Sequence, residues 1–227
     1  MNPMFYQKPI VLNVKDHKDW KIETVKDYAF AKKTNSVYLL VTEFVLASKE
    51  YPIVFFRNND TVMPIALLGL QKDNNQFIVP KGGWDADYIP AYVRRYPFIP
   101  VTKEGSDESM LCIDADYKGL NSKKAKLPLF NQDGNPDVVT QQAMNLLQNF
   151  DSENKVTTKF CKDIDDLDLF EEVYVEGENI KLGGFLRINH EKFTNLDAKI
   201  IKNLFDSSSL EPIYAHFQSL ANLKKLA

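Results

Sequence analysis

The chain has 227 residues, of which 44 % are hydrophobic and 12 % aromatic, and its net charge is -3. This composition can build a core and excludes a disordered chain, while 28 basic against 31 acidic residues leave no overall field to hold a polyanion, which disfavours nucleic-acid binding. The N-terminus lacks the pattern of a signal peptide and no apolar run is long enough to span a bilayer, so we expect a cytoplasmic protein without a transmembrane segment.

Short runs rich in Val, Ile and Phe predict a mainly β-structured N-terminal half. The expected strands are KIETV, VYLL, PIVFF, VMPIALLGL, QFIV and PFIPV, with hairpin-type breaks at RNND and QKDNN. Between VYLL and PIVFF, Thr42 is expected to cap a short helix that ends before Pro52. A turn from Ser106 to Met110 is expected to lead into a further strand, MLCIDA.

The C-terminal half shows helical spacing. Asn135 and Pro136 have the pattern of an N-cap and a first helical position, and the apolar residues that follow predict a helix over about residues 136–150. The polar stretch DSEN interrupts this pattern, so a second or kinked helix is expected after it.

The last third of the chain predicts a hairpin followed by helices. EEVYVEG and IKLGGFLRIN are strand-like and suggest a hairpin near Gly177, with turn or bulge geometry at Gly183–Gly184. Helices are expected over residues 197–205 and in the final segment, where Ser208 and Glu211 have capping-box spacing.

This order of elements predicts an α+β fold with a mainly antiparallel sheet in the N-terminal half and a helical C-terminal half. We expect one domain over residues 1–227, with a possible subdivision near residue 130. Cys112 and Cys161 have no CxxC-type spacing and are expected to be buried free thiols.

No catalytic or metal-binding motif is recognised. The sequence lacks a nucleophile elbow, a dinucleotide-binding loop and a phosphate loop, so catalytic residues stay unknown. His17, His190 and His216 lie far from one another and from both cysteines, which disfavours a zinc site. The stretch DADYKG begins like a calcium loop, but Lys118 and Ala125 occupy positions that require oxygen ligands. No metal and no cofactor are expected.

The stretch YIPAYVRRYPFIP, residues 88–100, is the most distinctive part of the chain. Its prolines limit any helix to little more than one turn and a half, which predicts a short and rigid element. Tyr92 and Tyr96 can share a face of it, whereas Arg94 and Arg95 must diverge by about 100°. At least one arginine should therefore reach solvent or a polar partner.

Two interpretations of this arginine pair stay open. The chain has only four arginines among 28 basic residues, so two adjacent ones suggest a need for the planar guanidinium. They could pair within the chain, for example with Asp85, Asp87 or a helix C-terminus, or they could bind the carboxylate or phosphate of a ligand or partner.

The acidic run DIDDLDLFEEVYVEGE, residues 163–178, contains no basic residue. It could recruit a basic partner, or it could be a solvated helix face and loop, because like charges usually cluster where water screens them.

Several stretches together resemble the bacterial SapC family: TEFVLASKEYPIVFF, PIALLGL, WDADYIPAYVRRYPF, GFLRIN and LEPIYAHFQSLANLKKL. The resemblance spans nearly the whole chain and is weakest over residues 101–135. The family is named after a protein linked to surface-layer protein secretion, which implies an accessory role and establishes no catalytic residues. The matching positions are candidates for ligand or partner binding: Trp84, Tyr88, Tyr92, Arg94, Arg95, Tyr96, Tyr214 and His216.

The resemblance and the missing catalytic motif favour a non-enzymatic binding or assembly protein, with a protein or peptide partner in surface-layer or secretion-linked processes. One alternative is an enzyme acting on a peptide or small polar substrate, in which Arg94 or Arg95 clamps an anion and a tyrosine or His216 moves a proton. Another is a structural subunit of a larger assembly such as a virus particle.

Overall fold

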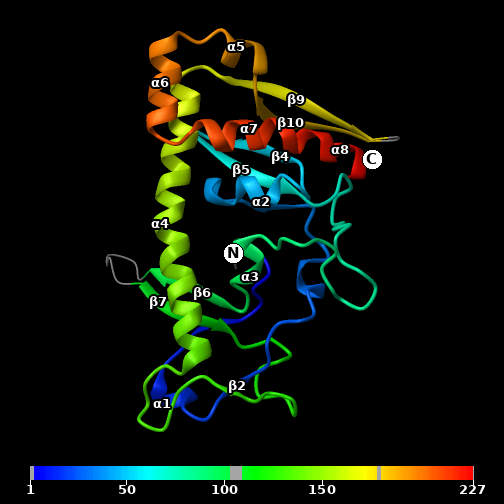
Figure 1. Ribbon diagram of the computed structural model, residues 1–227. Helices are drawn as coiled ribbons and strands as arrows, with labels where there is room; N and C mark the ends of the chain where they lie inside the picture. Colours follow the sequence, from blue (N-terminus) through cyan, green and yellow to red (C-terminus); the bar gives the residue numbers. More distant parts are fainter. Residues whose placement is uncertain (1–2, 103–108, 178–179, 227) are drawn as a thin grey trace.

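Five antiparallel strands from both halves of the chain form the central sheet of the computed structural model, which describes residues 3–102, 109–177 and 180–226 (Figure 1). Their order in the sheet is β3-β5-β4-β10-β9. The strands are β3 (Ser36–Tyr38), β4 (Ile53–Asn58), β5 (Thr61–Leu67), β9 (Phe170–Gly177) and β10 (Ile180–Ile188). The predicted α+β class is confirmed, and the predicted hairpin of the C-terminal half extends this sheet through the pairing of β10 with β4.

Two smaller sheets lie toward the opposite end of the molecule (Figure 1). One has the order β1-β7-β6, and the other pairs β2 with β8. Their bounds are β1 (Pro9–Val11), β2 (Lys21–Ile22), β6 (Phe98–Thr102), β7 (Ser109–Asp114) and β8 (Leu127–Pro128). The turn expected from Ser106 to Met110 falls partly on residues 103–108, outside the described residues, while Ser109 and Met110 already belong to β7.

Not every expected strand forms. RNND connects β4 and β5 as a hairpin, with Asn58 opposite Thr61. The strand expected at QFIV, by contrast, is absent from this described segment, where Ile78 makes only an isolated bridge with Trp84. The amide of Gly82 bonds back to the carbonyl of Val79, so the chain turns before a ladder can extend.

Helix α4 (Val138–Asp166) runs along most of the molecule and connects the region of the small sheets with the central sheet (Figure 1). The break expected at DSEN is wrong, because the helix is continuous through it. There the Ser152 hydroxyl donates to the carbonyl of Asn149, and Lys155 pairs with Asp151 one turn earlier at 2.9 Å. These local contacts keep polar residues compatible with helical backbone on an exposed face.

Three capping predictions are wrong. Asp137, not Asn135, is the N-cap of α4, and its carboxylate accepts a hydrogen bond from the amide of Val138. Ser208 has a positive φ of 58°, and the N-cap of the last long helix is Ser209, which makes no side-chain cap bond. The Thr42 hydroxyl donates instead to Glu153 on α4. A neighbouring side chain takes the place of the expected bond at α4 and a tertiary contact does so at Thr42, whereas no side-chain cap bond replaces the one expected from Ser208.

The remaining helices are short. They are α1 (Val14–His17), α2 (Phe44–Ala47), α3 (Ala91–Arg94), α5 (His190–Thr194), α6 (Ala198–Asp206), α7 (Leu210–Ser219) and α8 (Leu223–Leu226), with 3₁₀ turns η1 (Ala29–Ala31), η2 (Val41–Glu43) and η3 (Leu220–Asn222). Helices α2, α5, α6, α7 and α8 lie at the end of the molecule that holds the central sheet, whereas α1 lies at the opposite end beside β2 (Figure 1). The helix predicted over 197–205 corresponds to α6. In the part of the chain that the structure describes, no helix is long and apolar enough to cross a membrane.

A large aromatic core lies around the central sheet, and a smaller one packs beneath the two short sheets. Phe44, Tyr51 and Phe55 are fully buried in the first. Cys112 and Cys161 are buried and free, as the sequence predicts. The register of β10 shifts between Leu182 and Phe185, which confirms the bulge expected at the glycine pair.

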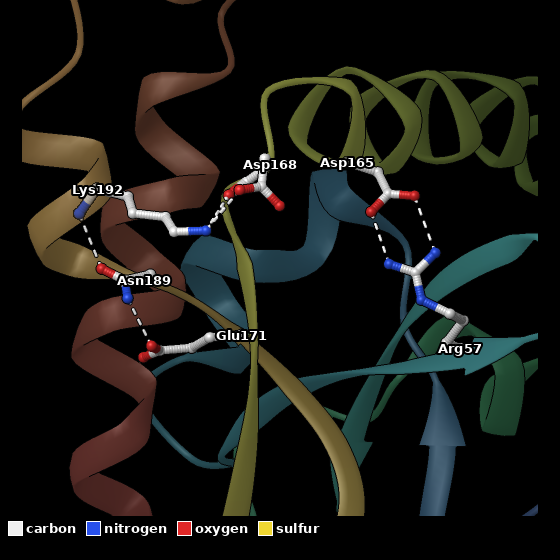
Figure 2. A network of polar contacts seen from close by, with 6 residues as sticks. All are labelled: Arg57, Asp165, Asp168, Glu171, Asn189 and Lys192. Carbon is white, nitrogen blue, oxygen red and sulfur yellow. Dashed lines mark hydrogen bonds and ion pairs between the residues drawn. The ribbon is translucent and has the colours of Figure 1, made fainter.

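The acidic run is solvated and also paired with bases of the same chain (Figure 2). The Arg57 guanidinium bonds both carboxylate oxygens of Asp165, at 2.9 and 2.6 Å, and thereby ties β4 to the end of α4. Lys192 pairs with Asp168 at 2.7 Å. These bonds satisfy acids that a basic partner would otherwise have to reach, so the solvated helix face is the better interpretation.

We expect Arg57→Ala to cost about 0.5–1 kcal/mol in urea unfolding, because the pair is bidentate but exposed to water. Arg57 lowers the pKa of Asp165, so this contribution is present above the usual carboxyl pKa and disappears as the pH falls through the lowered value. The loss should shrink in high salt. Lys202→Ala, which removes an exposed ion pair with Asp206 inside α6, is the control. If the stability lost in Arg57→Ala did not depend on salt concentration, an electrostatic origin would be contradicted.

Candidate functional site

The stretch from Tyr88 to Pro100 forms the predicted short, rigid element. Pro90 is the N-cap of α3, the four-residue helix that carries Arg94, and the chain then turns into β6. The amide of Phe98 bonds back to the carbonyl of Arg95, and the peptide bond between Tyr96 and Pro97 is cis. Pro90 and the backbone hydrogen bond of Phe98 therefore restrict the backbone that presents these side chains.

Glu43 caps the N-terminal end of α3, and it is not among the site residues predicted from the sequence. Its side chain is buried and accepts hydrogen bonds from the amide of Ala91 at 2.7 Å, the hydroxyl of Tyr88 at 2.7 Å and the amide of Leu40 at 2.9 Å. Burial raises the pKa of Glu43, and these hydrogen bonds oppose the rise. The one available sequence signal was its place in the stretch TEFVLASKEYPIVFF that resembles the family.

The side chain of Arg94 is exposed, and contacts with Ile89 and Tyr88 orient its guanidinium. Its Nε donates to the carbonyl of Ile89 at 2.9 Å, and its Nη2 lies 3.4 Å from the hydroxyl of Tyr88. Neither Asp85 nor Asp87, the partners expected for an internal pair, forms an ion pair with it in the described structure. The guanidinium therefore stays available on the surface.

Arg95 points the other way and is only 8 % exposed. Its Cζ lies 3.7 Å from the centroid of the Tyr92 ring and 5.2 Å from that of Phe150. Its Nε has no hydrogen-bond partner, and no carboxylate among the described residues forms an ion pair with it. The predicted divergence of the two arginines is thus observed, with one in solvent and one stacked between rings.

Three cavities surround α3, and the N-terminal half of α4 lines all of them. One of about 380 Å³ is bordered by both arginines and by Leu146. A second of about 530 Å³ is lined by Tyr92, Arg95 and Phe150. The third, of about 240 Å³, contains Glu43, Tyr88 and Arg94 in its wall. The arginine pair therefore lies at the junction of these cavities.

Two other candidates of this block, Trp84 and Tyr96, make contacts that support the element of residues 88–100. The indole of Trp84 donates to the hydroxyl of Tyr51 at 2.7 Å, and that hydroxyl donates to the backbone carbonyl of Tyr88. Tyr96 is buried; its ring stacks on Phe30, and its hydroxyl lies 3.3 Å from a carboxylate oxygen of the buried Asp114. These contacts give both residues a structural role.

The second block, with Tyr214 and His216 on α7, lies apart from the arginines. His216 is fully buried between strands of the central sheet. Its Nε2 accepts from the amide of Ile188 at 3.1 Å, so its Nδ1 carries the proton that it donates to the carbonyl of Ile53 at 2.9 Å. Burial lowers the pKa of His216 to about 4. Because both ring nitrogens bond the backbone, His216 is not placed to carry a proton for the enzyme alternative. Tyr214 is half exposed, and its ring packs against Phe217.

A family model described as SapC matches residues 12–226, which is nearly the whole chain. The chain belongs to the SapC family. Searches of curated proteins and of solved structures gave no significant match.

The match of this SapC-family chain includes both blocks of candidate residues and also the stretch 101–135, where the resemblance was weakest. Of the eight candidates, the structure brings six together around α3 and places two on α7. No group of three or more His, Cys, Asp or Glu side chains suited to a metal ion occurs within residues 3–102, 109–177 and 180–226.

Proposed function

We propose that this SapC-family chain is a non-enzymatic binding or assembly protein that holds part of a protein or peptide partner at the surface around α3. The buried Arg95, whose Nε has no hydrogen-bond partner and whose guanidinium meets rings and the side chain of Tyr6 but no described carboxylate, carries this proposal together with the exposed Arg94. Buried charges in folded proteins are normally paired, so a stacked guanidinium without a carboxylate favours an anionic group from outside the chain. The family name supports a role accessory to surface-layer or secretion-linked processes.

The composition of this surface agrees with partner binding. Arginine and tyrosine are over-represented among the residues that dominate binding energy in interfaces, and they act best beside enclosed pockets. Arg94, Tyr88 and Tyr92 border cavities of about 240 to 530 Å³ and project from one rigid element. Little ordering of the backbone is then needed on binding, which favours affinity.

An immobilised chain should recover a specific protein from an extract of its source cells, and Arg94→Ala should lower that recovery about tenfold, as loss of an interface arginine does. Arg187→Ala is the matched control, because Arg187 is also an exposed arginine and lies in an ion pair on β10. Equal recovery by the Arg94 variant, or no specific protein with the unaltered chain, would count against this surface as a partner site.

One observation favours the alternative of an enzyme acting on a small polar or peptide substrate. The carboxyl group of Glu43, with its raised pKa, lies beside Tyr88 and Arg94 in the wall of a cavity, and perturbed acids in clefts often act in catalysis. Its three accepted hydrogen bonds, two of them from backbone amides, already explain its burial as a cap. Binding is therefore the function that the geometry supports best.

A further inference from the structure

The cavity of about 530 Å³ has an unusual combination of lining groups. Its wall is largely apolar and is supplied by strands β3 and β5, by the N-terminal segment and by α4. The apolar lining residues include Met4, Val37, Met63, Ile65, Leu147 and Phe150. This volume lies within the range of about 300–1,000 Å³ that is typical of small-molecule sites.

Arg95 is the sole cation among the described lining residues of this cavity. Both rings that flank its guanidinium, Tyr92 and Phe150, line the same cavity. Most of the other polar groups are already engaged: the Tyr38 hydroxyl donates to Asn154 at 2.7 Å, and the exposed Asp151 pairs with Lys155 at 2.9 Å, while Ser36 adds a small neutral hydroxyl. The cavity therefore offers one positive charge, apolar walls and two ring faces.

We propose that this cavity binds the carboxylate end of an apolar chain, with Arg95 as its counter-ion. A buried cation without an anionic partner is costly, the Nε of Arg95 has no hydrogen-bond partner, and a planar guanidinium matches the two oxygens of a carboxylate. A singly charged group is favoured over a phosphate dianion, because the cavity supplies a single cation and carries the negative Asp151 on its border. This inference goes beyond the proposed function, because it requires no protein partner to be captured.

Calorimetric titration of the purified full chain with octanoate tests the proposal, beside octan-1-ol as the uncharged analogue and acetate as the charge without the apolar chain. Octanoate should bind at least about tenfold more tightly than either analogue, since charge and apolar burial each contribute. Equal affinity for octanoate and octan-1-ol would overturn the role of Arg95, and equal affinity for octanoate and acetate would overturn that of the apolar walls.

Two variants locate the site. Arg95→Met keeps an unbranched side chain and removes the charge, so octanoate affinity should fall about tenfold or more while the urea midpoint of the free protein stays equal or rises. Ser36→Phe fills the cavity from β3 without changing Arg95, and it should weaken octanoate binding to a similar extent. If Arg95→Met does not fold, octanoate binding by Ser36→Phe tests the proposal alone. An octanoate affinity equal to that of the unaltered chain in the folded variants would overturn the proposal.

A carboxylate on an apolar chain can come from a lipid-derived acid or from the C-terminus of a peptide. A short peptide ending in leucine, compared as the free acid and as the amide, separates these sources. Preference for the peptide acid over octanoate assigns the site to a chain terminus, and preference for octanoate assigns it to an alkyl carboxylate. No distinction between the acid and the amide, together with no octanoate binding, would show that the cavity does not recognise carboxylates.

Discussion

Replacing His216 by alanine is expected to lower the free energy of unfolding by about 3–5 kcal/mol. The imidazole connects two strands of the central sheet, because it accepts from the amide of Ile188 on β10 and donates to the carbonyl of Ile53 on β4. Its removal leaves both backbone groups buried without a partner and opens a cavity against Phe55, whose ring centroid is 5.2 Å away. Urea unfolding at neutral pH measures the loss.

His190→Ala is the control for this substitution, since His190 is exposed at the start of α5, loses only an edge contact with the Phe217 ring at 4.9 Å, and should change stability by less than about 1.5 kcal/mol. A second readout is pH. The unfolded imidazole takes up a proton near its ordinary pKa of 6.5 and the folded one only near 4, so stability should fall by about 3 kcal/mol as the pH drops through this window. The His216 variant should lack this component; an equal pH dependence would contradict a buried neutral imidazole.

Replacing Glu43 by alanine is expected to cost about 3–4 kcal/mol, because two buried donors and one partly buried donor lose their shared acceptor. Two of them are the amides of Leu40 and Ala91, and the third is the hydroxyl of Tyr88. The same change should loosen α3 and with it the orientation of Arg94. Urea unfolding gives the stability, and hydrogen exchange at the amide of Ala91 reports the local effect.

Thr42→Ala provides the comparison for Glu43, because Thr42 is its exposed neighbour and bonds Glu153 on the surface. That change should stay within about 0.5–1 kcal/mol. If Glu43→Ala were equally mild and left the exchange of Ala91 unaltered, the carboxyl group would not be the cap of α3. Its raised pKa would then point to the catalytic alternative.

Local sequence rules were sufficient for several features around the site. The prolines that flank AYVRR permit only a short helix, and adjacent residues on any helix diverge, so the separation of Arg94 from Arg95 followed from the sequence. The hairpins, the bulge at Gly183–Gly184 and the free buried thiols depend on similarly local or compositional properties. The short helix, the hairpins and the bulge involve few residues that are neighbours in the sequence, and the burial of the thiols agrees with the usual behaviour of free cysteines.

The sequence by itself determined the family resemblance, the α+β class and the short rigid element of residues 88–100. Only the tertiary structure decided which groups meet there: Glu43 reaches α3 across 48 positions of sequence, and Phe150 of α4 covers Arg95. It also placed His216 on α7, where its imidazole bonds the backbone of β10 and β4 and not the arginines. Burial, hydrogen-bond partners and unpaired charge depend on contacts between distant segments, which periodicity and spacing along a chain do not specify.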